Sequence, residues 1–220
     1  MTPLAIVCEG ESEAGFVKSV LAPELAQRGV AASGWPMHGA LNFDRTVRFL
    51  RRALTQRSQY VATFFDLFRL SPTFPGFAEA QAIRDPVARA ASLEESLHGA
   101  IVEAAACRPE RFLPHIQPYE FEALVFSDVG TLVSLEPEWA ASRSRLAAVR
   151  ASAQTPEHIN DGPETHPSKQ LAPLRPRYRK TLHGPSAIAR VGLSRVRSEC
   201  PHFGAWLSRI ERVSPLGAGT

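Results

Sequence analysis

Cysteine is scarce in this chain, and the motifs of several common site types are missing from it. The three cysteines lie far apart and form no C-x-x-C pair, which argues against a disulfide framework and against a thiolate zinc site. No G-x-x-x-x-G-K-[ST] motif occurs, so the chain carries no P-loop. The seven histidines are dispersed, and we set aside His202, two residues after Cys200, as a metal signal.

Long apolar runs are also missing. No stretch reaches the ~18 apolar residues of a membrane span, and no basic leader precedes an apolar segment at the N-terminus. We therefore expect a cytoplasmic protein with no membrane contact and with reduced cysteines. A hydrophobic content of 44% and a charged content of 21% are typical of a folded globular chain.

Basic residues are concentrated in the last quarter of the 220 residues. Between Lys169 and Arg212 the sequence has ten basic and two acidic residues, whereas the formal charge of the whole chain is only +3. The remainder is therefore net acidic. This asymmetry favours a polyanion-binding surface beside a cation-binding cleft, although an arginine-rich solvated helix would look the same. The nucleic-acid-binding residues that we predict are Arg175, Arg177, Arg179 and Lys180.

Strand and helix patterns alternate along the first 135 residues. Apolar or β-branched runs predict strands at residues 4–8, 30–37, 60–65 and 112–117, the last weakened by Pro114. Helical spacing predicts helices over 14–29, from Asn42 or Asp44 to about Arg57, and from Pro86 to about Cys107. This order predicts an α/β fold with a mostly parallel four-stranded sheet flanked by helices.

The rest of the chain, residues 136–220, predicts a helical and loop-rich basic extension packed on a core of residues 1–135. A helix is expected over 138–152. The proline-rich segment 155–176 has a turn at Asn160-Asp161-Gly162 and predicts a disordered segment or a functional loop. Helical spacing returns over 185–213, in two pieces that are separated at Pro201.

Carboxylates follow the predicted strands. Glu9 ends the first strand, Glu13 lies in the first turn of the next helix, and Asp66 ends the strand at 60–65. Glu120 and Glu122 follow the fourth strand. Because the carboxyl ends of parallel strands meet at one edge of a sheet, we expect these residues to converge. Acidic residues in a first helical turn also stabilise the helix dipole, which is the interpretation that we prefer for Glu11.

Carboxylates without histidine or thiolate partners suit Mg²⁺ or Mn²⁺, which commonly complete their coordination with substrate phosphates. A metal bound by Glu9 and Asp66, and a second bound by Glu13 with Glu120 or Glu122, would support phosphodiester hydrolysis. Lys169 is the candidate loop cation that would neutralise the phosphate, and a solvated lysine is an equal alternative.

Several segments resemble a known family. They are residues 6–13 (IVCEGESE), 66–68 (DLF), 74–76 (FPG), 116–124 (IQPYEFEAL), 159–169 (INDGPETHPSK) and the tail 200–207. This set resembles the Toprim-like bacterial family called domain of unknown function 4276, which is similar to the overcoming-lysogenization-defect nucleases.

The resemblance implies a Toprim core with metal ligands at Glu9, Glu13 and Asp66, and with Glu120 or Glu122 as further acids. It also implies catalytic roles for Glu9, Asp66 and Lys169, and a partnership with an ABC-type ATPase in defence against phage. Two positions depart from the pattern. Phe68 stands where the Toprim signature has a second aspartate, and Gln170 stands where a second basic residue is expected.

These observations give a first hypothesis, an Mg²⁺-dependent nuclease acting on DNA or RNA. The alternative is a non-catalytic subunit that uses the same scaffold and basic tail to bind nucleic acid or a partner ATPase. Hydrolysis of a small nucleotide is a third possibility.

Overall fold

The computed structural model describes residues 1–39, 41–159 and 165–216 of the chain. Its centre is a five-stranded sheet, in which every pairing is parallel. The strand order is β2-β1-β3-β4, with β5 also paired to β3. The strands are β1 (Thr2–Cys8), β2 (Val30–Pro36), β3 (Tyr60–Asp66), β4 (Phe112–Leu113) and β5 (Ile116–Gln117). The predicted α/β class with a mostly parallel sheet is confirmed.

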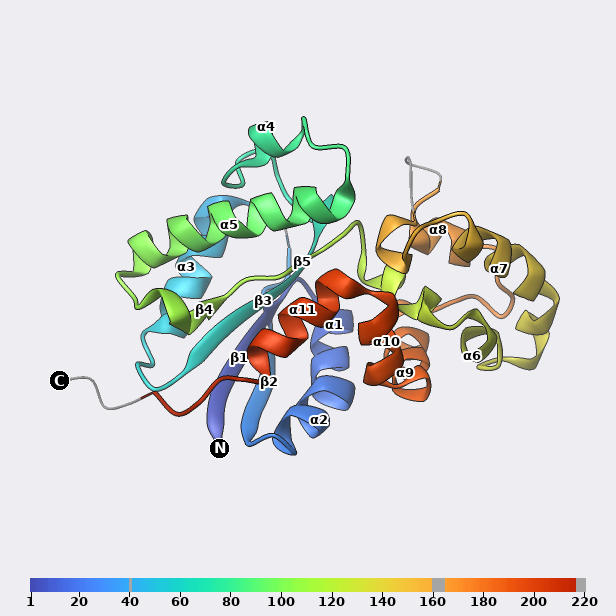
Figure 1. Ribbon diagram of the computed structural model, residues 1–220, viewed down its shortest axis with the longest axis horizontal. Coiled ribbons are helices and arrows are strands. Elements are labelled where there is room, and N and C mark those ends of the chain that lie inside the picture. Colours follow the sequence, from blue (N-terminus) through green and yellow to red (C-terminus); the bar gives the residue numbers. More distant parts are fainter. Residues whose placement is uncertain (40, 160–164, 217–220) are drawn as a thin grey trace.

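Helices cover both faces of this sheet, with α3 and α5 on one face and α1, α2 and α11 on the other (Figure 1). The helices of the first half are α1 (Glu11–Phe16), α2 (Ala22–Ala26), α3 (Phe43–Leu54), α4 (Phe77–Ala80), α5 (Pro86–Ala105) and α6 (Val129–Val133). A π-helical stretch, Val17–Leu21, makes α1 and α2 continuous. Those of the second half are α7 (Arg143–Ala151), α8 (Pro167–Leu171), α9 (Lys180–Val191), α10 (Leu193–Glu199) and α11 (Pro201–Ile210).

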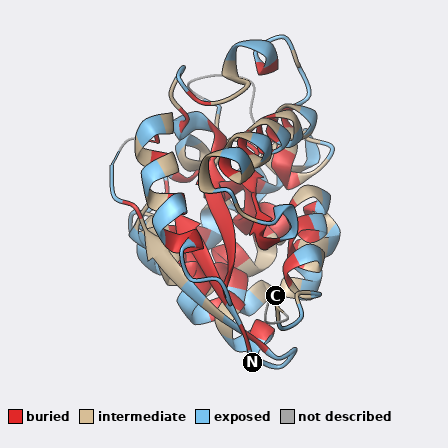
Figure 2. Ribbon diagram, turned by 90° about the vertical axis from the view of Figure 1, so that its left-hand side faces the viewer, coloured by how far each residue is buried: buried red, intermediate tan, exposed pale blue. Residues whose placement is uncertain are grey.

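The two apolar layers follow from the alternation of side chains along the strands. In β3, Ala62 and Phe64 belong to the layer under α1 and α11, whereas Val61 and Phe65 belong to the layer under α3 and α5. Every residue of β3 is buried. Figure 2 shows this strand in the buried centre of the molecule, with exposed residues on the outer helices.

Most predicted elements are present, two differ in detail, and one lies outside the described residues. The fourth strand consists of two short pieces, β4 and β5, because Pro114 has no N–H for the ladder. The helix predicted over 138–152 begins as a 3-10 turn and is α-helical from Arg143. The predicted turn at Asn160-Asp161-Gly162 lies outside the described residues.

The helix break predicted at Pro201 is present, but the predicted number of helical pieces over 185–213 is wrong. The segment has three helices, the first of which begins at Lys180 rather than at Pro185. Gly192, with a φ of +82°, separates α9 from α10, and Pro201 begins α11. Within the described residues, no helix is long and apolar enough to cross a bilayer.

Candidate functional site

Three of the predicted carboxylates converge at the carboxyl ends of the parallel strands. Glu13 lies in the first turn of α1, Asp66 ends β3, and Glu122 lies in the 3-10 segment Phe121–Ser127. All three side chains are at least 96% buried. We call Glu13, Asp66, Glu122 and the lysine described next the carboxylate–lysine cluster.

Lys180, the first residue of α9, occupies the centre of this cluster. Its Nζ lies 2.8 Å from Glu13 Oε1, 2.9 Å from Asp66 Oδ2 and 3.3 Å from Glu122 Oε2. The lysine side chain is 32% exposed, so it closes the cluster on the solvent side. The basic run in the sequence groups Lys180 with the arginines of a predicted nucleic-acid surface, but the structure places its ammonium among the carboxylates.

Backbone contacts fix two of the carboxylates in place. Asp66 Oδ1 accepts a hydrogen bond from the Phe121 N–H at 2.8 Å, and Glu13 Oε2 accepts one from the Gly10 N–H at 3.2 Å. Glu13 therefore caps α1 and also binds the Lys180 ammonium. Glu122 Oε2 is close enough to Lys180 for an ion pair, and it has no hydrogen-bond partner in the described part of the chain.

Burial shifts the pKa values of groups in this cluster. Burial, with the charges of Glu13 and Glu122, raises the pKa of Asp66 well above its usual range, although Lys180 opposes this. Burial likewise raises the pKa of Glu122. Burial alone would lower the pKa of Lys180, but the three carboxylates outweigh it and raise that pKa. The lysine thus remains charged, and one ammonium faces three acids.

Glu9 lies beside the cluster and has a partner of its own. Its Oε1 accepts a hydrogen bond from Arg69 Nε at 2.7 Å, and Arg69 belongs to the 3-10 turn Leu67–Arg69 that follows β3. The other oxygen, Oε2, is buried with no hydrogen-bond partner among the described residues. Burial raises the pKa of Glu9, and the pairing with Arg69 offsets part of that increase.

Glu120 points to a different segment from Glu122. It accepts hydrogen bonds from the Ser168 N–H at 3.0 Å and the Ser168 hydroxyl at 3.2 Å, and its Oε2 lies 3.1 Å from His166 Nδ1. These contacts cap the short helix α8, which also carries the exposed residue Lys169. Lys169 therefore directly follows Ser168, the residue that binds Glu120.

The remaining predicted residues lie on the segment that leads into α9. Arg175, Arg177 and Arg179 are exposed, consistent with a solvated basic strip. Glu11 is exposed as well and lies 3.3 Å from His38 Nε2, away from the ammonium contacts.

Two features of the cluster were not found from the sequence. Lys180 was assigned to another surface because nothing in its local spacing connects it with residues that precede it by 58 to 167 positions. Tyr178, two residues earlier, has a buried hydroxyl with no hydrogen-bond partner among the described residues. Burial and the charge of Glu122 raise the pKa of this phenol.

A family model described as Domain of unknown function (DUF4276) matches residues 8–211 of the chain. This range contains every residue of the carboxylate–lysine cluster. Neither the curated proteins nor the solved structures contain a match to the chain.

Proposed function

The chain belongs to the DUF4276 family, and we propose that it hydrolyses phosphodiester bonds in DNA or RNA with the help of Mg²⁺ or Mn²⁺. The observation that supports this most directly is the convergence of Glu13, Asp66 and Glu122 on one cation position at the carboxyl ends of parallel strands. Ligands of open α/β sheets bind at this edge. The resemblance to Toprim nucleases in the sequence points in the same direction.

The donor set fits a hard divalent ion, because all its ligand atoms are carboxylate oxygens. Burial of three acids against one ammonium leaves negative charge that a second cation would neutralise, and the buried Oε2 of Glu9 adds an oxygen without a hydrogen bond. Among the described residues, these oxygens are not all within 4.8 Å of one another. Mg²⁺ keeps several of its waters. It therefore suits widely spaced carboxylate oxygens better than an ion that is coordinated by protein atoms alone. When bound, the ion supplies an activated water and stabilises the leaving oxygen.

The chain's own residues would contribute binding and charge. Lys180, whose pKa the carboxylates raise, would contact a non-bridging phosphate oxygen after turning from the carboxylates toward solvent. Arg69 holds Glu9 in place and adds a positive charge at the rim. Lys169 remains the predicted loop cation. Glu120 caps α8 and would hold in place the helix that carries Lys169.

Nuclease assays with matched variants test this proposal. The purified protein should cleave DNA or RNA with Mg²⁺ or Mn²⁺ but not with EDTA, and Asp66→Asn or Glu9→Gln should lower the rate at least ~100-fold. Glu24→Gln, an exposed acid on α2, is the control and should leave the rate unchanged. Full activity in both site variants would contradict the assignment.

A second candidate is a non-catalytic subunit that binds nucleic acid or a partner. The specific observation in its favour is that Lys180 already occupies the centre of the carboxylates, as a built-in counter-ion. Phe68, 45% exposed where a further acid would be expected, agrees with this alternative. Calorimetry separates the two candidates, since uptake of nucleic acid without uptake of Mg²⁺ or Mn²⁺ would support the second.

The exposed arginines would hold the polymer in either case. Replacing Arg175, Arg177 and Arg179 together by glutamate should weaken nucleic-acid binding and flatten its salt dependence. If only a small nucleotide is hydrolysed, the same triple variant should keep its full rate.

We further propose, from the resemblance, that the protein works in the cytoplasm beside an ABC-type ATPase in anti-phage defence. Co-purification of the ATPase with the tagged chain from its native host would support this, and loss of phage protection in Asp66→Asn would link it to the site.

A further inference from the structure

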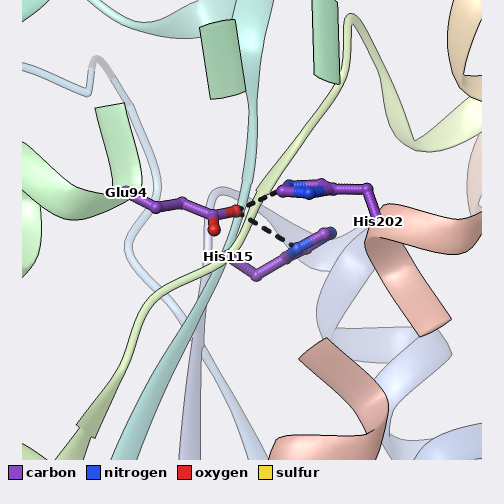
Figure 3. A group of neighbouring side chains, drawn as sticks. All are labelled: Glu94, His115 and His202. Carbon is purple, nitrogen blue, oxygen red and sulfur yellow. Dashed lines mark hydrogen bonds and ion pairs between the residues drawn. The ribbon is translucent and has the colours of Figure 1, made fainter. Parts of the chain in front are cut away.

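A second group of metal-ligating side chains lies outside the carboxylate–lysine cluster. It consists of Glu94 from the middle of α5, His115 from the link between β4 and β5, and His202 from the first turn of α11 (Figure 3). One potential ligand atom from each residue lies within 4.8 Å of the other two. Glu94 Oε1 is 2.8 Å from His202 Nε2 and 3.4 Å from His115 Nδ1. Three segments far apart in sequence therefore present two imidazoles and a carboxylate to one point.

The hydrogen bonds around His115 leave one ring nitrogen unsatisfied. The ring is fully buried, and its Nε2 lies 3.2 Å from Gln117 Oε1, an amide oxygen that can only accept. With the proton on Nε2, the lone pair of Nδ1 points toward Glu94 Oε1, which is 3.4 Å away. A cation bound between these two atoms would be held by both groups.

The other two ligands are positioned by contacts of the kind seen behind metal sites. Glu94 Oε1 accepts the Ile116 N–H at 2.7 Å, which fixes the carboxylate beside the β4–β5 link. The backbone N–H of His202 donates to Glu157 Oε2 at 3.0 Å, which fixes the start of α11. Such outer contacts orient ligands before an ion arrives.

We propose that Glu94, His115 and His202 form a binding site for a transition-metal ion, for which Zn²⁺ is the best match. Two imidazole nitrogens and one carboxylate oxygen suit Zn²⁺ and disfavour Mg²⁺, which prefers oxygen. Three protein ligands leave the fourth tetrahedral position for water. The side chains of Glu94 and His202 are 12% and 10% exposed, so an ion can enter from their side while His115 forms the floor.

The three ligands come from α5, the β4–β5 link and α11, so a bound ion would connect these three segments. Bound Zn²⁺ therefore stabilises the folded chain. Its residues are separate from Glu13, Asp66 and Glu122, and it does not depend on the proposed hydrolysis. The ion binds the folded state and raises the melting temperature by mass action.

Titration of the chelator-treated full chain with Zn²⁺ tests this inference. Calorimetry should show one equivalent bound, and Co²⁺ in place of Zn²⁺ should give the intense visible absorption of a four-coordinate ion. His202→Gln, which retains a donor toward Glu94, and His115→Phe, which keeps a ring among aromatic neighbours, should each weaken Zn²⁺ binding at least ~100-fold.

Two controls identify the site. His98→Gln removes another α5 histidine and Glu24→Gln removes an exposed acid of α2, and both should leave Zn²⁺ binding unchanged. Anomalous diffraction at the zinc edge from Zn²⁺-soaked wild-type crystals locates the ion without relying on any variant. No uptake by the wild type, equal uptake by both ligand variants, or an anomalous peak elsewhere would overturn the proposal.

Discussion

Lys180 shares one ammonium among three buried carboxylates, so its loss has a larger effect than the loss of one ion pair. Removing a partner from a buried ionic group leaves uncompensated charge, which commonly costs about 3–5 kcal/mol. Lys180 is about one-third exposed, and solvent screening reduces that cost. We therefore expect Lys180→Met to lower the free energy of unfolding by ~2–4 kcal/mol, measured by urea denaturation.

The matched control is Lys18→Met, an exposed lysine on the π-helical stretch, which should change stability by no more than ~0.5 kcal/mol. Added Mg²⁺ should recover part of the loss in Lys180→Met, because the freed carboxylates then bind the ion more tightly. A variant as stable as the wild type would contradict the central role of this ammonium.

The thiols give a second prediction at this scale. Cys8 and Cys200 are buried, and burial raises the pKa of each thiol well above its usual range, so the reactive thiolate is scarce. Cys107 is half-buried, and its pKa is raised as well. Titration of the native protein with Ellman's reagent should label Cys107 slowly and the other two only after unfolding. Fast labelling of Cys8 in native buffer would contradict the packing of β1.

At the scale of the element, the N-cap of α5 links the sequence signal to a pH dependence. Asp85 Oδ1 accepts the Ala88 N–H at 2.7 Å, and this hydrogen bond is the main reason that the pKa of Asp85 is lowered. A lowered folded-state pKa gives stability that is present above the unfolded value of about 3.9 and is lost as the pH falls through the folded value.

We expect Asp85→Ala to cost ~1 kcal/mol at pH 7 and less at pH 3, measured by denaturant titration at both pH values. Asp85→Asn retains a capping oxygen without the charge. Measured against Asp85→Asn instead of the wild type, the cost of Asp85→Ala should therefore be nearly the same at pH 7 and at pH 3. Equal costs of Asp85→Ala at both pH values would show that the charge of this cap does not matter.

Glycine in two helices allows another matched comparison. A Cβ at Gly184 in α9 would lie 2.6 Å from the Phe121 ring and 3.0 Å from the Tyr178 hydroxyl, whereas a Cβ at Gly99 in α5 would meet nothing within 4 Å. Gly184→Ala should therefore destabilise the protein by ~1–3 kcal/mol through overpacking, although alanine favours a helix. Gly99→Ala should stabilise it by up to ~1 kcal/mol. Thermal denaturation of both variants shows whether each is stabilised or destabilised relative to the wild type. Stabilisation by Gly184→Ala would contradict the close approach of α9 to Phe121.

The elements that the sequence predicted well are those with a strong local signal. Continuous apolar or β-branched runs gave β1 and β3, the Asp85 cap gave the start of α5, and Asn42, one of two predicted caps, is the N-cap of α3. The start of α9 was missed because Pro185 is inside the helix, although proline is most common in a first turn. The side chain of its first residue, Lys180, contacts Asp66 and Glu122, and no local pattern contains these contacts.

The same reasoning applies to the two candidate sites. The topology of a parallel sheet was enough to bring Glu13 and Asp66 to one edge. It was not enough to place Lys180 or to separate Glu120 from Glu122, because neighbouring residues point to different partners. The group of Glu94, His115 and His202 has no spacing signature at all, since its members come from three elements that meet only through tertiary packing.

At the scale of the whole molecule, one apolar layer joins the two halves of the chain. The layer beneath α1 contains Ile6 and Phe64 from the strands, and it also contains Trp139, Phe203 and Trp206 from beyond residue 135. The predicted boundary at 135 therefore crosses a continuous core. Two segments that share a core unfold together, because neither buries its apolar surface alone.

We therefore expect a single unfolding transition, with equal calorimetric and van't Hoff enthalpies, for the full chain. Trp206→Ala should lower the free energy of unfolding by ~3–5 kcal/mol, since the indole is almost fully buried, donates to the Leu113 carbonyl at 3.2 Å and stacks on His115. Leu182→Ala, at an exposed position of α9, is the control and should change it little. A fragment of residues 1–135 should lack cooperative unfolding because α11 no longer covers β3 and β4. Two separate transitions in the full chain, or a fragment that melts cooperatively, would instead establish the first 135 residues as an independent domain.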